Sequence, residues 1–202
     1  MPLYNVFQKG LIRGFDRHDP EKAYVEHPTE GWRVYLRSCM FLHPHEPFHP
    51  LHFLVLKRKG AHRTSAAWEP PNGPMEGKEW KKNRPLMQCL LENALRETEE
   101  EAHIAKVDHI RHTGLVFQSQ EKDYLPHHYF QYHIFQGTIS PEQIHGSFST
   151  FEWMKEHKSA VKRWKKDRQE TDAASWFHPR NTRLSPRWCP DIVALYVNHY
   201  SR

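Results

Sequence analysis

The sequence predicts an α/β (mixed α+β) domain in which a central sheet is combined with a few helices. Strand-like segments outnumber helical ones along the chain, and neither an internal repeat nor a low-complexity tract interrupts them. This order of elements favours a mixed fold over a helical bundle. The length of 202 residues is typical of one domain and is sufficient to bury a hydrophobic core.

Four segments have the composition of strands. Trp32–Leu42 alternates apolar and basic side chains, which predicts a half-buried strand. The other three are rich in β-branched and aromatic residues, and they are Leu51–Lys57, Gly114–Gln118 and His127–Ile139. Between the first two strands, the prolines of His43–Pro50 predict a solvated loop, and the spacing of its histidines is poor evidence for a metal site.

Three segments are predicted as helices. Pro85 suits a first helical turn, and neither glycine nor proline follows it up to Ala102. Phe151–Gln169 is predicted as a basic helix. Asp191–Tyr200 is predicted as a terminal helix with Pro190 at its first turn.

Composition excludes several classes of protein. Aromatic residues make up 13% of the chain, which is too many for a disordered protein, and no apolar run is long enough to cross a membrane. We therefore expect a soluble globular protein without a membrane partner. The net charge of +5 favours anionic partners.

Cysteine usage indicates a reducing, intracellular compartment. The three cysteines, Cys39, Cys89 and Cys189, are far apart and form no CxxC pair, so neither a disulfide framework nor a cysteine zinc site is expected. The N-terminal residues do not have the pattern of a secretory signal, so none is expected. The basic residues among them faintly resemble an organelle transit peptide, which allows a mitochondrial location.

The predicted helix Pro85–Ala102 carries an unusual set of carboxylates. At about 100° per residue, Glu97, Glu100 and Glu101 fall within roughly 100° of arc at the edge of the apolar face. Carboxylates this close repel one another, and a divalent cation with oxygen ligands relieves the repulsion. The alternative is a solvated acidic run at a helix end. Glutamates there oppose the helix dipole, which counts against an origin in stability alone.

The stretch Trp68–Ile104 resembles the signature of the Nudix hydrolases, G-x5-E-x7-R-E-U-x-E-E-x-G-U, in which U is a bulky apolar residue. Gly73 and Glu79 match its first part, and the segment from Arg96 to Ile104 matches its second part. Sixteen residues rather than seven separate Glu79 from Arg96. His103 stands in place of the last glycine, and Thr98 in place of an apolar residue.

This resemblance implies a Nudix-like α/β/α sandwich with a mixed central sheet and hydrolysis of a pyrophosphate bond in a nucleotide. It implies Mg²⁺ or Mn²⁺ on Glu97, Glu100, Glu101 and the Gly73 carbonyl, with Arg96 and Glu79 orienting the carboxylates. Glu97 or Glu100 would accept the proton of water. Candidate bases outside the signature are Glu121, Glu142, Glu152 and Glu170. Residues 1–202 would form one Nudix domain with an N-terminal extension (about 1–30) and insertions at about 80–88 and 151–170.

Basic residues gather in two segments outside the acidic helix. The first holds Lys81, Lys82 and Arg84, and the second holds Lys155, Lys158, Lys162, Arg163, Lys165 and Lys166. Trp153 and Trp164 interleave with the second set, a pattern typical of nucleic-acid binding. The alternative is an amphipathic surface helix whose tryptophans pack inward. The two readings are compatible.

Together these features favour a nucleotide or a 5′-triphosphorylated RNA as substrate. Within the Nudix family they resemble an RNA 5′-pyrophosphohydrolase or a factor of mitochondrial mRNA stability. An alternative is a non-enzymatic Nudix-fold module for RNA binding or ribonucleoprotein assembly. A third reading gives the 17 histidines a metal-sensing or pH-switching role.

Overall fold

A computed structural model describes residues 2–19, 22–62, 65–80 and 83–200 of the chain. Its strands are β1 (Ile12–Phe15), β2 (Ala23–Glu26), β3 (Arg33–Pro44), β4 (Leu54–Arg58), β5 (Trp68–Glu69), β6 (Asn72–Pro74), β7 (Asp108–Ser119), β8 (His128–Ile139) and β9 (Thr171–Trp176). Its helices are α1 (Leu86–Ala102), α2 (Pro141–Glu156), α3 (Lys158–Val161) and α4 (Cys189–Tyr200), with 3-10 turns η1 (Gly77–Glu79) and η2 (Asp167–Gln169). Within these ranges no helix has the length and apolarity needed to cross a membrane.

The larger sheet is mixed, as the sequence predicts. Its strand order is β1-β2-β3-β8-β7, and β6 pairs with β3. The central strands β3 and β8 run parallel, whereas the other pairs are antiparallel. A smaller sheet has the order β5-β4-β9.

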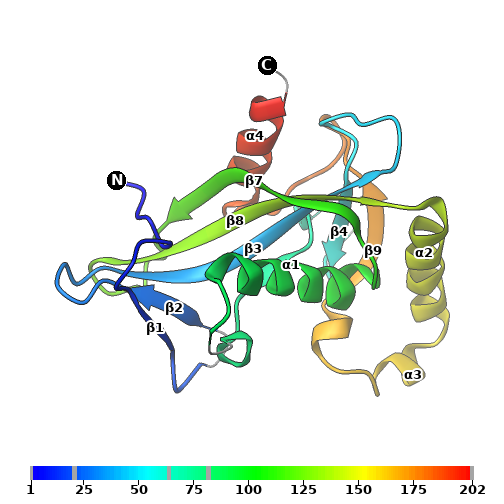
Figure 1. Cartoon of the computed structure of the whole chain (residues 1–202). Helices are drawn as coiled ribbons and strands as arrows, with labels where there is room; N and C mark the ends of the chain where they lie inside the picture. Colours follow the sequence, from blue (N-terminus) through cyan, green and yellow to red (C-terminus); the bar gives the residue numbers. More distant parts are fainter. Residues whose placement is uncertain (1, 20–21, 63–64, 81–82, 201–202) are drawn as a thin grey trace.

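Helices cover both faces of the larger sheet, which makes an α/β/α sandwich (Figure 1). Alternate residues of β3 enter two different cores because successive side chains of a strand point to opposite faces. Leu36 and Met40 pack in the core that contains α1, and Cys39 and Phe41 pack in the core that contains α4. The fold class predicted from the sequence is therefore confirmed.

The prediction of a single helix over Phe151–Gln169 is wrong. α2 begins ten residues earlier, at Pro141, where Ser140 and Gln143 form a capping box. It ends at Glu156, and the chain then turns so that Val161 is buried and Trp164 packs partly against the same core. The predicted helix thus corresponds to the last residues of α2, the short helix α3 and the 3-10 turn η2.

Two other segments differ in extent from the prediction. The N-terminal extension contains β1 and β2, which continue the larger sheet beyond β3. The predicted strand Gly114–Gln118 is the second half of β7. Both halves of β7 pair with β8, and a register shift separates them. Gly114, which has a φ of +82°, lies at this irregularity.

His133 gives the fold a specific pH dependence. It is fully buried on β8, and neither ring nitrogen has a hydrogen-bond partner among the described residues. Burial lowers the pKa of His133 to about 3, with the charge of His112 adding to the effect. Because an unfolded histidine has a pKa of about 6.5, the unfolded chain binds the extra proton in the intervening pH range.

The contribution of His133 to stability is therefore present above about pH 6.5 and is lost as the pH falls toward 3. The expected slope is about 1.4 kcal/mol per pH unit. Urea unfolding of wild type and His133→Phe between about pH 5 and 6.5, where the unfolded histidine takes up its proton and the folded one does not, measures this difference. We expect the stability of wild type to fall more steeply than that of the variant on acidification. Parallel curves would contradict the assignment.

Candidate active site

β6 contacts both β3 of the larger sheet and the acidic helix α1. Ser38 of β3 lies opposite Gly73 of β6, and the Ser38 hydroxyl donates to the Leu90 carbonyl of α1 at 2.9 Å. A Cβ atom on Gly73 would lie only 2.2 Å from the Glu97 carboxyl group. Only glycine allows β6 and this carboxylate to approach so closely.

Arg96 on α1 holds the carboxylates of this region together. Its guanidinium donates to Glu79 Oε1 at 3.1 Å and to Glu97 Oε1 at 2.7 Å. It also donates to Glu100 Oε2 at 2.6 Å and lies 3.3 Å from Glu76 Oε1. Glu79 therefore reaches Arg96 despite the longer separation in sequence, since η1 ends at Glu79 and α1 begins at Leu86, ten residues before Arg96.

Glu97 and Glu101 are buried carboxyl groups whose pKa values are raised. Each has less than a tenth of its surface exposed. Burial raises the pKa of Glu97 to about 8, although the adjacent Arg96 charge opposes the shift. Burial and the charge of Glu97 raise the pKa of Glu101 well above its usual range, while the backbone N–H of Asn72 donates to Glu101 at 2.9 Å. Both carboxylates thus lie where added positive charge would favour the ionised form.

These groups line a cavity of about 250 Å³. Gly73, Arg96 and the three predicted metal ligands of α1, Glu97, Glu100 and Glu101, line it. Of the four candidate bases outside the signature, Glu121 and Glu170 line this cavity, whereas Glu142 and Glu152 lie on α2 and do not.

The cavity also has cationic and aromatic residues that the sequence analysis did not identify. They are Arg37, Arg58, Tyr132, Arg187 and Trp188. The guanidinium of Arg37 lies 4.9 Å from the ring centroid of Trp188 and donates to Glu121 at 2.7 Å. No local pattern identifies Arg37 as a site residue, since alternation along its strand predicts a solvated side chain on a half-buried strand.

The donor set fits a divalent cation such as Mg²⁺. Carboxylate and carbonyl oxygens are the ligands that this ion prefers, and here two of the carboxylates are buried with raised pKa values. As the side chains stand, no three His, Cys, Asp or Glu residues in the described ranges converge on one point. The reason is that Glu97 and Glu100 turn toward Arg96, while Glu101 accepts from Asn72.

His103 ends α1 in the left-handed conformation, with a φ of 57°. The Nudix pattern has glycine here, which adopts this conformation without a steric cost. The His103 ring lies 5.0 Å from the Phe151 ring and 5.7 Å from the Trp164 ring, measured between centroids. The imidazole therefore connects the end of α1 to α2 and to the basic segment.

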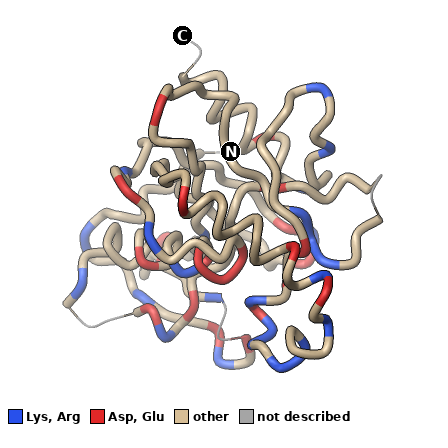
Figure 2. The backbone as a smooth tube through the Cα atoms, turned by 90° about the vertical axis from the view of Figure 1, so that its right-hand side faces the viewer, with Lys and Arg blue, Asp and Glu red and all other residues tan. Residues whose placement is uncertain are grey.

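The predicted nucleic-acid-binding residues do not form one surface. Lys81 and Lys82 lie outside the described residues, and Arg84 pairs with Glu92. Lys165 and Arg168 line a hollow of about 450 Å³ together with Trp164. Arg163 and Lys166 are exposed. Figure 2 shows most acidic and basic segments intermingled in the lower half of that view.

The hollow beside Trp164 continues the candidate site, because Arg96 and Glu100 line both cavities. Lys155, Lys158 and Lys162 line a different pocket. The alternative of inward-packed tryptophans holds for Trp164 alone. Trp153 remains 38% exposed and stacks on Trp164 at 5.6 Å between ring centroids.

No protein-family model matches this chain, and neither does any curated protein. Among solved structures, it is similar to a Nudix hydrolase from Nitrosomonas europaea, with 12% identity over 83% of this chain and 88% of that one and a TM-score of 0.47. It is also similar to a MutT Nudix hydrolase from Burkholderia pseudomallei (14% identity, 80% and 97% coverage, TM-score 0.44). A third is the Ap4A hydrolase of C. elegans (13% identity, 84% and 99% coverage, TM-score 0.44). At these values we draw function from the site itself.

Proposed function

We propose that this chain is a Nudix pyrophosphohydrolase that cleaves a phosphoanhydride bond in a nucleotide substrate. The observation that carries the proposal is that Glu97, Glu100, Glu101 and Gly73 all line one cavity. Arg96 lines the same cavity, and Glu79, the other fixed polar residue of the signature, forms an ion pair with it at 3.1 Å. A non-enzymatic RNA-binding module would have no need of such a set.

A divalent metal would be held by Glu97, Glu100, Glu101 and the Gly73 carbonyl. When bound, it would neutralise phosphate oxygens and make water more acidic. The chain itself contributes a base and cationic side chains. Glu100 is the base we favour, because it lines the cavity and is less buried than Glu97. It accepts a proton as the water oxygen bonds to phosphorus, and the bridging P–O bond breaks to release the second phosphate group as an oxyanion.

Three arginines of the cavity have the charge to bind the phosphate chain. They are Arg37, Arg58 and Arg187. Arg37 is held by Glu121 and by surrounding aromatic rings, so its guanidinium is fixed before substrate arrives. Such preorganised charge stabilises the transition state without a reorganisation cost.

We further propose the 5′ end of an RNA as the preferred substrate. The hollow lined by Trp164, Lys165 and Arg168 adjoins Arg96 and Glu100, where a strand leaving the cavity would pass. An indole can stack on a base and a lysine can pair with a phosphate. An RNA strand would extend from the catalytic cavity into this hollow, whereas a free nucleotide bound in the cavity would not reach it.

Lys165→Gln separates these two substrates. For 5′-triphosphorylated RNA we expect KM to rise about five-fold, which corresponds to roughly 1 kcal/mol of lost binding. For the matching nucleoside triphosphate, we expect KM and kcat to stay at the wild-type values. Initial rates of phosphate or pyrophosphate release measure both, with Lys9→Gln as the control for loss of one charge. Equal effects on the two substrates would contradict the RNA assignment. RNA affinity that persists in EDTA, with no turnover of any substrate, would instead support the non-enzymatic module.

A further inference from the structure

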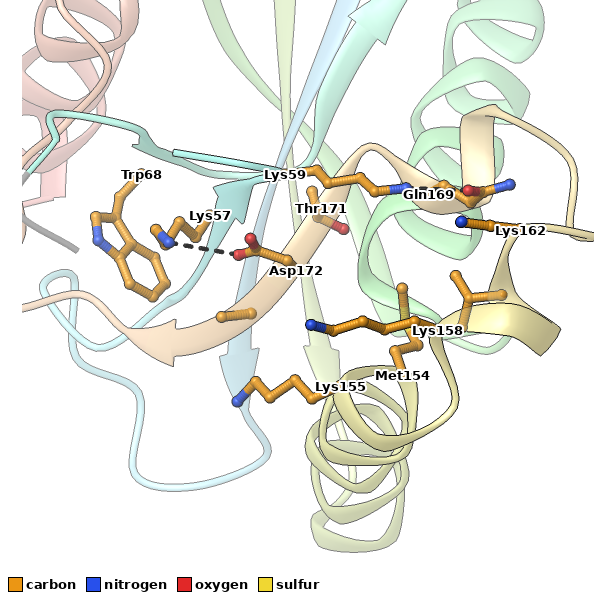
Figure 3. Close-up of a pocket in the computed structure, with 12 residues that line it drawn as sticks. Lys57, Lys59, Trp68, Met154, Lys155, Lys158, Lys162, Gln169, Thr171 and Asp172 are labelled. Carbon is orange, nitrogen blue, oxygen red and sulfur yellow. Dashed lines mark hydrogen bonds and ion pairs between the residues drawn. The ribbon is translucent and has the colours of Figure 1, made fainter. Parts of the chain in front are cut away.

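A second pocket adjoins the candidate active site and lies between the β4–β9 pair and the α2–α3 segment. Its volume is about 700 Å³, within the usual range for small-molecule sites. Five lysines line this pocket, which we call the lysine pocket: Lys57, Lys59, Lys155, Lys158 and Lys162. In Figure 3, Lys155 and Lys158 extend from the α2–α3 side toward β9.

Most of this positive charge lacks a neighbouring carboxylate. Lys57 pairs with Asp172 at 3.6 Å, and Lys155 pairs with Glu152 at 2.6 Å. Lys59 donates to the neutral amide of Gln169 at 3.0 Å. In the described part of the chain, no acidic group lies within ion-pair distance of Lys158 or Lys162. Several like charges around one pocket repel, and a bound polyanion would relieve that repulsion.

The chain separates this pocket from the catalytic carboxylates. Lys57 and Lys59 line the lysine pocket, whereas Arg58 between them faces the candidate active site and donates to Glu69 at 2.5 Å. The segment 167–172 divides in the same way. Asp167 and Glu170 line the active site, and Gln169, Thr171 and Asp172 line the lysine pocket. The two sites therefore share a wall but not their charged side chains.

The pocket also has the features needed to bind a nucleoside. Trp68, Met154 and Val161 supply apolar surface, and an indole is a good stacking surface for a planar base. In Figure 3, Asp172 lies between Trp68 and Lys158. A carboxylate in that position can accept a hydrogen bond from a ribose hydroxyl while the lysines meet phosphate groups.

We propose that the lysine pocket is a second nucleotide-binding site, distinct from the catalytic one. Lys158 and Lys162 bind the phosphate groups of the ligand, and Trp68 contacts its base. The ligand is a free nucleotide or a nucleotide unit of an RNA strand, since both present the same phosphate and base. This proposal goes beyond the hydrolase function and does not require it.

The test is calorimetric binding of ATP and of a short 5′-phosphorylated RNA in excess EDTA, where metal-dependent binding at the glutamates is silent. The proteins are wild type, Lys158→Gln/Lys162→Gln and the control Lys9→Gln/Lys106→Gln, which removes the same charge from exposed positions outside the pocket. We expect at least a ten-fold loss of affinity in the pocket variant for whichever probe binds wild type, and none in the control. Circular dichroism verifies that each variant is folded.

A second comparison addresses the base. Trp68→Leu is expected to weaken ATP binding about ten-fold while leaving the binding of inorganic tripolyphosphate unchanged, because only ATP has a base that can stack on the indole. The proposal is overturned if neither probe binds wild type, if the pocket and control variants bind equally, or if Trp68→Leu weakens both phosphate ligands alike. If wild type binds the RNA and not ATP, the site takes a nucleotide unit of an RNA strand. If it binds ATP at least as tightly as the RNA, the site takes a free nucleotide. A chain that binds in EDTA but never hydrolyses would refute the hydrolase function and leave this site standing.

Discussion

Replacing Glu100 by glutamine is expected to lower kcat for pyrophosphate-bond hydrolysis by about 10²- to 10⁴-fold, the usual contribution of a positioned general base. Glutamine keeps the size of the side chain but has no charge and accepts no proton. The side chain of Glu100 is held by Arg96 at 2.6 Å at the edge of the cavity, so the substitution removes chemistry rather than shape.

Glu142→Gln is the matched control for this variant. Glu142 is an exposed glutamate in the first turn of α2, outside the cavity, and was one of the candidate bases. We expect its kcat to remain at the wild-type value. Equal rates for wild type and Glu100→Gln would remove Glu100 from the chemistry. A large loss in Glu142→Gln would move the base to α2.

Gly73→Ala is expected to lower kcat/KM by about 100-fold, because displacing a reacting group by about 1 Å has an effect of this order. The new methyl group would lie 2.2–2.5 Å from the three carboxyl atoms of Glu97. Arg96 restrains that carboxylate, which lies 2.7 Å from its guanidinium. The carboxylate must therefore leave its position, although the fold itself loses only about 1–3 kcal/mol of stability.

Gly146→Ala provides the opposite case in the same protein. Gly146 lies within α2, and an added Cβ would meet no atom within 4 Å. Alanine there is expected to stabilise the chain by about 0.5–1 kcal/mol and to leave activity unchanged. Parallel thermal melts and rate assays separate the two glycines. Wild-type activity in Gly73→Ala would show that the approach of β6 to Glu97 has no role in the site.

The sequence was informative about α1 because two independent signals coincide there. Periodicity places Glu97 and Glu101 partly on the apolar face, and the structure buries both of them. The same helix starts and ends within one residue of its predicted bounds, since Pro85 and His103 mark both ends. Local rules suffice where the cap, the apolar stripe and the charged residues all lie within one element.

Other parts of the site depend on contacts between distant segments, which local patterns do not reveal. Arg37 looks like a solvated strand residue, yet both faces of β3 are covered and its partners Glu121 and Trp188 are far away in sequence. The pattern of the basic segment predicts one helix, but the packing of Val161 and Trp164 against the core turns the chain and divides its cations between two cavities. Charge composition alone shows neither the turn nor the separation.

The most direct test of the proposed function is the metal dependence of phosphoanhydride cleavage by the wild-type chain. Nucleoside triphosphates, a dinucleoside polyphosphate and 5′-triphosphorylated RNA are each incubated in excess Mg²⁺ or in excess EDTA, and the released phosphate products are quantified. We expect cleavage of at least one substrate in Mg²⁺, loss of that cleavage in EDTA, and its recovery when Mg²⁺ is restored. Cleavage at the same rate in EDTA, or no cleavage of any of these substrates by folded protein in Mg²⁺, would contradict a metal-dependent hydrolase built on Glu97, Glu100 and Glu101.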